Sequence, residues 1–110
     1  MSSKAKSAQE KRASRVRRLD HTRQFDKDWD RLSASGRYDM HRLKAAMLLL
    51  AANDGPLPPE YQDHALTGEW RDFRECHVGG DFLLIYQVAG AAADEQVVFV
   101  RAGTHAELFR

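Results

Sequence analysis

Cysteine is nearly absent from this sequence of 110 residues: Cys76 is the only one, so no disulfide can form within the chain. We therefore expect a reducing, cytoplasmic location. Long hydrophobic runs are also missing, because the longest, Ala45–Ala52, is far shorter than the roughly 20 residues of a membrane-spanning helix. No secretory signal is recognisable behind the first lysines. Three prolines and seven glycines exclude a collagen-like or low-complexity chain, which leaves one domain with a single core.

The net charge of +1 hides an uneven distribution along the chain. Residues 1–24 carry eight basic and two acidic side chains, whereas residues 25–110 carry nine basic and fourteen acidic ones. Residues 1–13 are rich in Ser, Ala, Lys and Arg, so we expect a flexible basic arm ahead of a folded domain spanning 14–110. Such an arm can bind a polyanion, but charge alone favours an ordinary solvated tail.

Two amphipathic helices are predicted in the first half of the domain. Thr22 is a suitable N-cap for the first helix, and Gly36 suits the position just past its end. Asp39 can cap a second helix, which ends at the turn-forming stretch 53–56. Apolar residues recur at spacings of three and four in both segments, namely Phe25, Trp29 and Leu32, then Met40, Leu43, Met47 and Leu50. A short loop between the helices makes an antiparallel pair.

Strands dominate the second half of the chain. Apolar and alternating runs predict strands over 71–77, 82–88 and 97–102, and a shorter one over 14–20. Thr104 and Glu107 form a capping-box pattern that opens a short C-terminal helix. The predicted fold class is therefore α+β, with an N-terminal helical hairpin packed on an antiparallel β-sheet.

Polar residues are expected to converge at one end of this sheet. If consecutive strands form a meander, the strand order brings together His77, Asp81, Arg101 and His105. Two imidazoles can act as general base and general acid, and a guanidinium can bind phosphate oxygens and stabilise charge on them. This set suits phosphodiester cleavage by the RNA 2′-hydroxyl without a metal. From these residues alone, simple surface groups are an equally good interpretation.

Other candidates leave more than one interpretation open. Alone, His64 is best interpreted as a loop histidine, and Phe109 either stacks on an exposed base or closes the core. Arg71 and Arg74 either contact an RNA backbone or pair with neighbouring acids. Cys76 precedes His77 on a strand, so the two side chains point to opposite faces and a buried thiol is expected. Without a helical His spacing or a Cys pair, we predict no metal site and no cofactor.

Three motifs in this order resemble the YafQ branch of the RelE/ParE toxin superfamily, over roughly residues 15–110. They are D-H-x-L-x-G-x-W at 63–70, R-x-x-H-V-x-x-D at 74–81, and R-x-G-[ST]-H-x-x-L-F at 101–109. The resemblance implies a RelE-like fold of two helices against an antiparallel sheet. It also implies the toxin of a type II toxin–antitoxin pair, which cuts mRNA in the ribosomal A site and is masked by a cognate protein antitoxin. The implied partners are thus antitoxin, ribosome and mRNA, in the cytoplasm and with no membrane.

The resemblance also implies residue roles. It makes catalytic residues of His64, His77, Asp81 and His105. It implies substrate-binding roles for Arg101 at the scissile phosphate, for Phe109 at a base, and for Arg74 and Phe82. Phe82 stands where a relative has Trp, a change that can alter RNA packing. Two alternatives remain: a non-catalytic interaction protein like the ParE branch, and a metal-dependent hydrolase.

Overall fold

The computed structural model describes residues 16–91 and 93–109 of the chain. The predicted basic arm, residues 1–13, lies outside the described residues, as do the first two positions of the predicted strand 14–20. The strands are β1 (Arg18–His21), β2 (His64–Ala65), β3 (Arg74–Gly79), β4 (Phe82–Ala89) and β5 (Gln96–Gly103). The helices are α2 (Arg23–Ser35), α3 (Met40–Ala52) and α4 (His105–Leu108), with 3₁₀ turns η1 (Pro59–Tyr61) and η2 (Gly68–Trp70).

Local capping chemistry sets the helix ends where the sequence predicts them. The Thr22 hydroxyl accepts a hydrogen bond from the backbone N–H of Phe25, which begins α2. Gly36 follows the end of α2 with φ +70°, a conformation that suits glycine. Asp39 caps α3 with its carboxylate, and Asn53 ends it in the left-handed region. Both predicted helices are confirmed.

The five strands form one sheet in the order β1-β5-β4-β3-β2. The pairings β2–β3, β3–β4 and β4–β5 are antiparallel, as expected. The edge strand β1 differs because it pairs in parallel with β5. The chain between them includes both long helices, and parallel neighbours require such a long crossover. The strand predicted over 71–77 begins only at Arg74, because η2 and the turn after it occupy the preceding residues.

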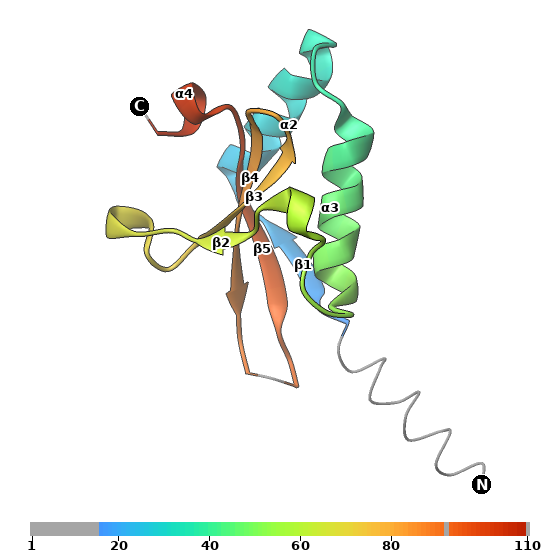
Figure 1. Ribbon diagram of the computed structural model, residues 1–110, viewed down its shortest axis with the longest axis vertical. Coiled ribbons are helices and arrows are strands. Elements are labelled where there is room, and N and C mark those ends of the chain that lie inside the picture. Colours follow the sequence, from blue (N-terminus) through green and yellow to red (C-terminus); the bar gives the residue numbers. More distant parts are fainter. Residues whose placement is uncertain (1–15, 92, 110) are drawn as a thin grey trace, which may run out of the picture.

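Apolar clusters cover the sheet on both faces. The larger cluster joins α2 and α3 to one face, with fully buried Leu32 and Leu43 against Leu84 and Val97. A smaller cluster of Leu83, Ile85 and Leu108 covers the other face, under the segment 66–73 and α4. Figure 1 shows α3 and α4 on opposite sides of the sheet. The expected packing of two helices on one face is therefore confirmed, and α4 lies across the sheet from α3. None of the helices in the described part of the chain is long and apolar enough to cross a bilayer.

Candidate active site

Three histidines from different elements surround the carboxylate of Glu75. The distances from Glu75 Oε1 to the imidazole Nε2 atoms are 3.6 Å for His64, 3.6 Å for His77 and 3.9 Å for His105. The ring centroids of His64 and His77 are 6.4 Å apart, and those of His77 and His105 are 6.0 Å apart. These four residues are called the histidine cluster below.

Strand register explains why the histidine cluster forms. His64 on β2 is the direct cross-strand partner of Glu75 on β3. His77 lies two residues further along β3, so it shares the face of Glu75, whereas Cys76 between them is buried under the helices. His105 is the first residue of α4, and the capping box of Thr104 and Glu107 fixes the start of that helix.

Burial differs sharply within the histidine cluster. Glu75 is only 3% exposed, while the side chains of His64 and His105 are about half exposed and that of His77 is partly exposed. A buried carboxylate therefore lies beneath a rim of solvent-accessible imidazoles. A charged group is buried in this way only when it has partners, and protonated imidazoles are suitable ones.

The three imidazole rings are tilted to one another, but each has its Nδ1 atom against an oxygen outside the cluster and its Nε2 atom towards Glu75. Each Nδ1 atom faces an oxygen of its own: His64 faces the carbonyl of Gln62 at 2.6 Å, His77 that of Gly80 at 3.3 Å, and His105 the carboxylate of Asp81 at 2.6 Å. A ring that donates its Nδ1–H leaves Nε2 as the basic atom. The functional Nε2 atoms of all three rings thus point into the histidine cluster.

Asp81 holds His105 through two contacts. Its Oδ1 atom accepts the ring Nδ1 hydrogen bond and, at 3.2 Å, the backbone N–H of His105. The side-chain hydrogen bond from His105, with the backbone one, lowers the pKa of Asp81 below its ordinary value. Asp81 is therefore a carboxylate at neutral pH and orients the imidazole.

A partly buried hydrogen-bond network holds the segment that carries His64. The Tyr86 hydroxyl donates to Asp63 Oδ1 at 2.5 Å, and the Arg74 guanidinium donates to Asp63 Oδ2 and to the Tyr86 oxygen, both at 3.2 Å. Burial of Tyr86, together with its bond to Asp63, raises the pKa of the phenol. Asp63 directly precedes His64, so this network fixes where β2 lies. Arg74, predicted to bind substrate, is placed here as a partner of Asp63.

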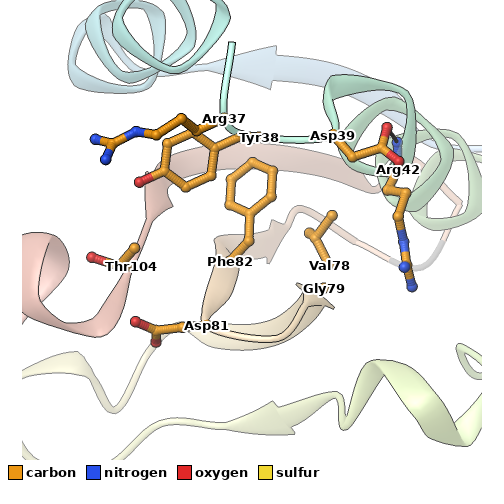
Figure 2. Close-up of a pocket in the computed structure, with 9 residues that line it drawn as sticks. All are labelled: Arg37, Tyr38, Asp39, Arg42, Val78, Gly79, Asp81, Phe82 and Thr104. Atoms are coloured by element: carbon orange, nitrogen blue, oxygen red, sulfur yellow. Dashed lines mark hydrogen bonds between the residues drawn. The ribbon is translucent and has the colours of Figure 1, made fainter. Parts of the chain in front are cut away.

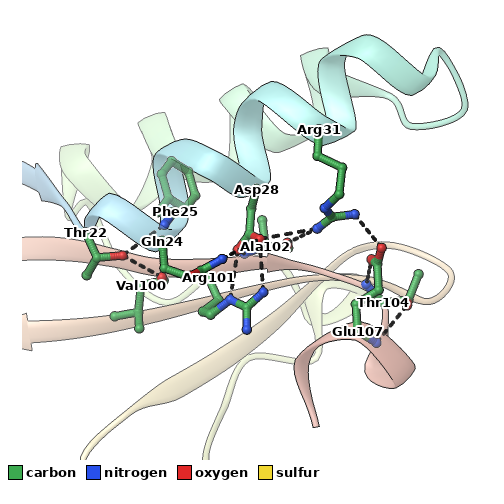
Figure 3. Close-up of polar contacts among 10 residues, drawn as sticks. All are labelled: Thr22, Gln24, Phe25, Asp28, Arg31, Val100, Arg101, Ala102, Thr104 and Glu107. Carbon is green, nitrogen blue, oxygen red and sulfur yellow. Dashed lines mark hydrogen bonds and ion pairs between the residues drawn. The ribbon is translucent and has the colours of Figure 1, made fainter. Parts of the chain in front are cut away.

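Arg101 lies on the same sheet face but outside the histidine cluster. Cross-strand pairing gives the row Glu75, Ile85, Arg101, so two strand spacings, about 10 Å, separate β3 from β5 there. Figure 3 shows the guanidinium turned towards Asp28 of α2, with Nε 2.9 Å from Oδ2 and a terminal nitrogen 3.0 Å from Oδ1. The expected convergence therefore holds for His77, Asp81 and His105, whereas Arg101 is directed to Asp28.

Asp28 is a buried acid, only 1% exposed, in the apolar face of α2. Besides the Arg101 bonds, it accepts the backbone N–H of Ala102 at 3.1 Å. Burial would raise the pKa of Asp28, but the hydrogen bonds from Arg101 and Ala102 outweigh it, so the pKa lies below its ordinary value. The same pair raises the pKa of Arg101.

The two predicted aromatic residues lie in different surroundings. Phe109 is 37% exposed, with its ring centroid 5.9 Å from that of His105 and 5.7 Å from that of Trp70. Phe109 is therefore an accessible ring beside the histidine cluster, and Leu108 is the residue that closes the core. Phe82 is buried and packs on Tyr38, with ring centroids 5.0 Å apart.

Cys76 is a buried thiol, as expected. It is fully buried in the helix-covered face, and this desolvation raises its pKa to about 12. A Cys–His nucleophilic pair is excluded by this placement. Within residues 16–91 and 93–109, no three His, Cys, Asp or Glu side chains are arranged to hold a metal ion.

Sequence reasoning missed Glu75 and Asp28 as parts of the site. Glu75 is separated from His77 by one residue on a strand, so both share a face, and this E-x-H spacing was a usable signal. Asp28 falls three residues after Phe25, within the apolar stripe of α2. An acid in such a stripe signals a buried partner.

This geometry can be compared with known proteins. The family model described as "Bacterial toxin of type II toxin-antitoxin system, YafQ" matches residues 17–110. The chain is 41% identical over 93 residues to the "mRNA interferase toxin YafQ" of Escherichia coli K12, covering 84% of this chain and 96% of the relative. It is 46% identical over 52 residues to a "Putative toxin YafQ" of Haemophilus influenzae, covering 47% and 51%.

Solved structures give the same result. The E. coli DinJ–YafQ toxin–antitoxin complex matches with a TM-score of 0.74 and 40% identity, over 86% of this chain and 99% of that one. A metal-bound toxin from Helicobacter pylori matches with a TM-score of 0.71 and 38% identity, over 84% and 98%. The fold and site thus define a toxin of the type II toxin–antitoxin class. Within that class, the chain belongs to the YafQ family.

Proposed function

We propose that this protein is a ribosome-dependent mRNA endoribonuclease that cuts through the 2′-hydroxyl of its substrate. The observation that carries the proposal is the convergence of three imidazole Nε2 atoms on Glu75. Such a group can remove one proton and donate another around a single reacting phosphate. The name of the E. coli relative, an mRNA interferase, supports the same activity.

The proposed reaction needs two proton transfers. One basic group, an imidazole Nε2 aided by Asp81, accepts the proton of the 2′-hydroxyl, and the 2′-oxygen forms a bond to phosphorus. The bond from phosphorus to the 5′-oxygen of the next nucleotide breaks, and a second imidazole, protonated and different from the base, of His105 or His64, donates a proton to that oxygen. The products are an upstream 2′,3′-cyclic phosphate and a downstream 5′-hydroxyl. Addition of water to the cyclic phosphate then gives a 3′-phosphate.

Substrate contacts are proposed for the residues around the histidine cluster. The exposed ring of Phe109, beside His105, is placed to stack on a base. Arg101 is partly exposed, and its pairing with Asp28 holds the guanidinium in place to attract a phosphate across Ile85. For Arg74 we propose an indirect role in substrate binding, because its guanidinium is held by Asp63 and Tyr86.

The proposed partners are a cognate protein antitoxin, the ribosomal A site and mRNA, all in the cytoplasm. The complex of E. coli YafQ with DinJ supports an antitoxin that binds the folded toxin. Residues 25–110 carry more acidic than basic side chains, so we propose that the basic side chains of residues 1–24 supply much of the attraction to ribosomal RNA.

Induced expression tests this function. We expect growth arrest, relieved by the antitoxin, and loss of arrest in His77→Ala and His105→Ala. His41→Ala removes an exposed imidazole of α3 and serves as the matched control. Circular dichroism verifies that the variants fold. Arrest by both site variants would contradict the assigned site. Mapping of mRNA 5′ ends separates this function from a non-catalytic toxin of the same fold, which would create no new ends.

A metal-dependent reaction is the second candidate, because two H. pylori structural neighbours are a metal-bound toxin and a copper-bound mutant toxin. Cleavage by purified protein before and after prolonged chelation, at constant magnesium for the ribosome, distinguishes the two mechanisms. We expect unchanged activity. Loss of cleavage after chelation, and its recovery when a transition metal is added, would favour the metal mechanism.

A further inference from the structure

A hollow of about 370 Å³ lies next to the histidine cluster, between the α2–α3 loop and the β3–β4 turn. Its wall includes Asp81, the residue that orients His105. Figure 2 shows Arg37 and Tyr38 on one side of the hollow and Asp81 on the other, with Arg42 at its far end. The hollow therefore adjoins the reacting centre without being part of it.

Two arginines in this wall have no carboxylate partner among the residues that the structure describes. Across the part of the chain that the structure describes, neither the Arg37 nor the Arg42 side chain makes an ion pair or hydrogen bond. The two carboxylates of the wall are already used, since Asp39 accepts backbone N–H groups of α3 and Asp81 accepts from His105. The hollow thus offers two free cationic groups, which are suited to an anion such as phosphate.

The hollow also has an aromatic wall and a suitable size. Tyr38 is partly exposed, and its ring packs against that of buried Phe82 at an interplanar angle of 53°. A Cβ atom added to Gly79 would lie 3.7 Å from Arg42 Cζ, so the guanidinium lies close over the turn that leads to Asp81. The volume is at the lower end for small-ligand sites and suits one nucleotide, with a base against an aromatic ring and a phosphate on guanidinium groups.

We propose that this hollow binds one nucleotide of the mRNA, directly beside the bond that is cut. The base stacks on Tyr38, and Arg37 and Arg42, which lie at opposite ends of the hollow (Figure 2), bind the two phosphates that flank this nucleotide. The proposal rests on the proposed endoribonuclease function and adds a substrate subsite to it. The mRNA is then held at two places: its scissile phosphate at the histidine cluster, and a neighbouring nucleotide in the hollow on the other side of Asp81.

Charge-neutral variants of the hollow test this subsite. In Arg37→Gln/Arg42→Gln, we expect KM for mRNA-programmed ribosomes to rise about tenfold, while kcat changes by less than about twofold. Lys27→Gln/Lys44→Gln removes the same charge from exposed positions on α2 and α3 that do not line the hollow, and it is the matched control. A KM equal to that of the control would overturn the proposal, and so would a fall in kcat at constant KM.

Photochemical crosslinking then identifies which RNA occupies the hollow. An mRNA with a 2′-deoxy nucleotide at the cut position and 4-thiouridine on either side of it is bound to ribosomes with the toxin. We expect a crosslink from one of the two positions to the segment 37–42, absent in the arginine double variant. Crosslinks from these positions to other parts of the toxin or to ribosomal RNA, with none to the segment 37–42, would overturn the assignment to mRNA.

Failure of the subsite is distinguishable from failure of the proposed function. If wild-type protein cuts mRNA and His105→Ala does not, the function stands whatever the arginine variants show. If wild-type protein makes no cut, the function fails first. Thermal unfolding of both double variants verifies that the fold is intact, because all four substituted side chains point to solvent or to the hollow.

Discussion

Asp81 and His105 are joined twice: the imidazole Nδ1 lies 2.6 Å from Asp81 Oδ1, and the backbone N–H of His105 donates to the same oxygen at 3.2 Å. One carboxylate therefore fixes both the ring and the first residue of α4. Since Nδ1 is occupied in this way, Nε2 is the atom left for proton transfer. This relationship makes Asp81 the residue on which the orientation of His105 depends.

Asp81→Ala should lower kcat about 100-fold, because the His105 ring loses its orienting carboxylate. Asp81 is exposed, so we expect little change in thermal unfolding. Single-turnover cleavage on programmed ribosomes measures the effect, and Asp30→Ala on the exposed face of α2 is the control. Full activity of Asp81→Ala would show that His105 needs no such partner.

Glu75→Gln keeps the size of the buried side chain but removes its charge. We expect kcat to fall at least about tenfold, because a protonated imidazole of the histidine cluster loses its anionic partner. The measurement is the rate of mRNA cleavage at saturating substrate. Glu69→Gln in the exposed η2 turn gives the control rate. If both variants cut at the wild-type rate, Glu75 has only a packing role.

Tyr86→Phe removes the hydroxyl that donates to Asp63. The lost hydrogen bond is expected to cost roughly 1–2 kcal/mol of unfolding free energy. The segment before His64 then loses an anchor, so kcat should also fall. In a His64→Ala background, the Tyr86 change should lower kcat no further, because its effect acts through His64. Independent, additive losses in kcat would contradict this positioning role.

The Asp28–Arg101 pair predicts a pH dependence of stability. The folded pKa of Asp28 lies below its ordinary value of about 3.9. Its contribution is therefore present above the unfolded pKa and is lost as the pH falls through the folded value. Asp28→Asn should lower the unfolding free energy at pH 7 by roughly 2 kcal/mol and make its fall below pH 4 shallower. Urea unfolding at pH 7 and pH 3 gives the unfolding free energy at pH 7 and its change with pH for each protein. The same change with pH in the wild type and in Asp28→Asn would contradict the assignment.

Sequence predicted the features that local chemistry sets. The caps at Thr22, Asp39 and Thr104 depend on residues within one turn, so both long helices and α4 begin where expected. The antiparallel meander followed from turns between consecutive strands, and it placed His77, Asp81 and His105 together correctly. The parallel pairing of β1 with β5 is not readable locally, because the two strands are separated by most of the chain.

The parts of the site that sequence reasoning missed depend on contacts across elements. Glu75 and His64 face each other only because β2 pairs with β3, and a two-residue strand carries no periodic signal. Arg101 was expected beside the histidines on strand order alone. Its actual partner, Asp28, comes from a helix, and the preference of a buried acid for a guanidinium decided the direction of that side chain.

The proposed mechanism depends on cleavage by the substrate's own 2′-hydroxyl, so removing this one oxygen atom from the mRNA tests it. Ribosomes are programmed with two mRNAs that differ only in a 2′-deoxy nucleotide on the 5′ side of the mapped cut. We expect the ribose mRNA to yield an upstream fragment ending in a 2′,3′-cyclic phosphate or 3′-phosphate, identified by mass, and the deoxy mRNA to stay intact. Cutting of the deoxy mRNA at the same bond would contradict the mechanism.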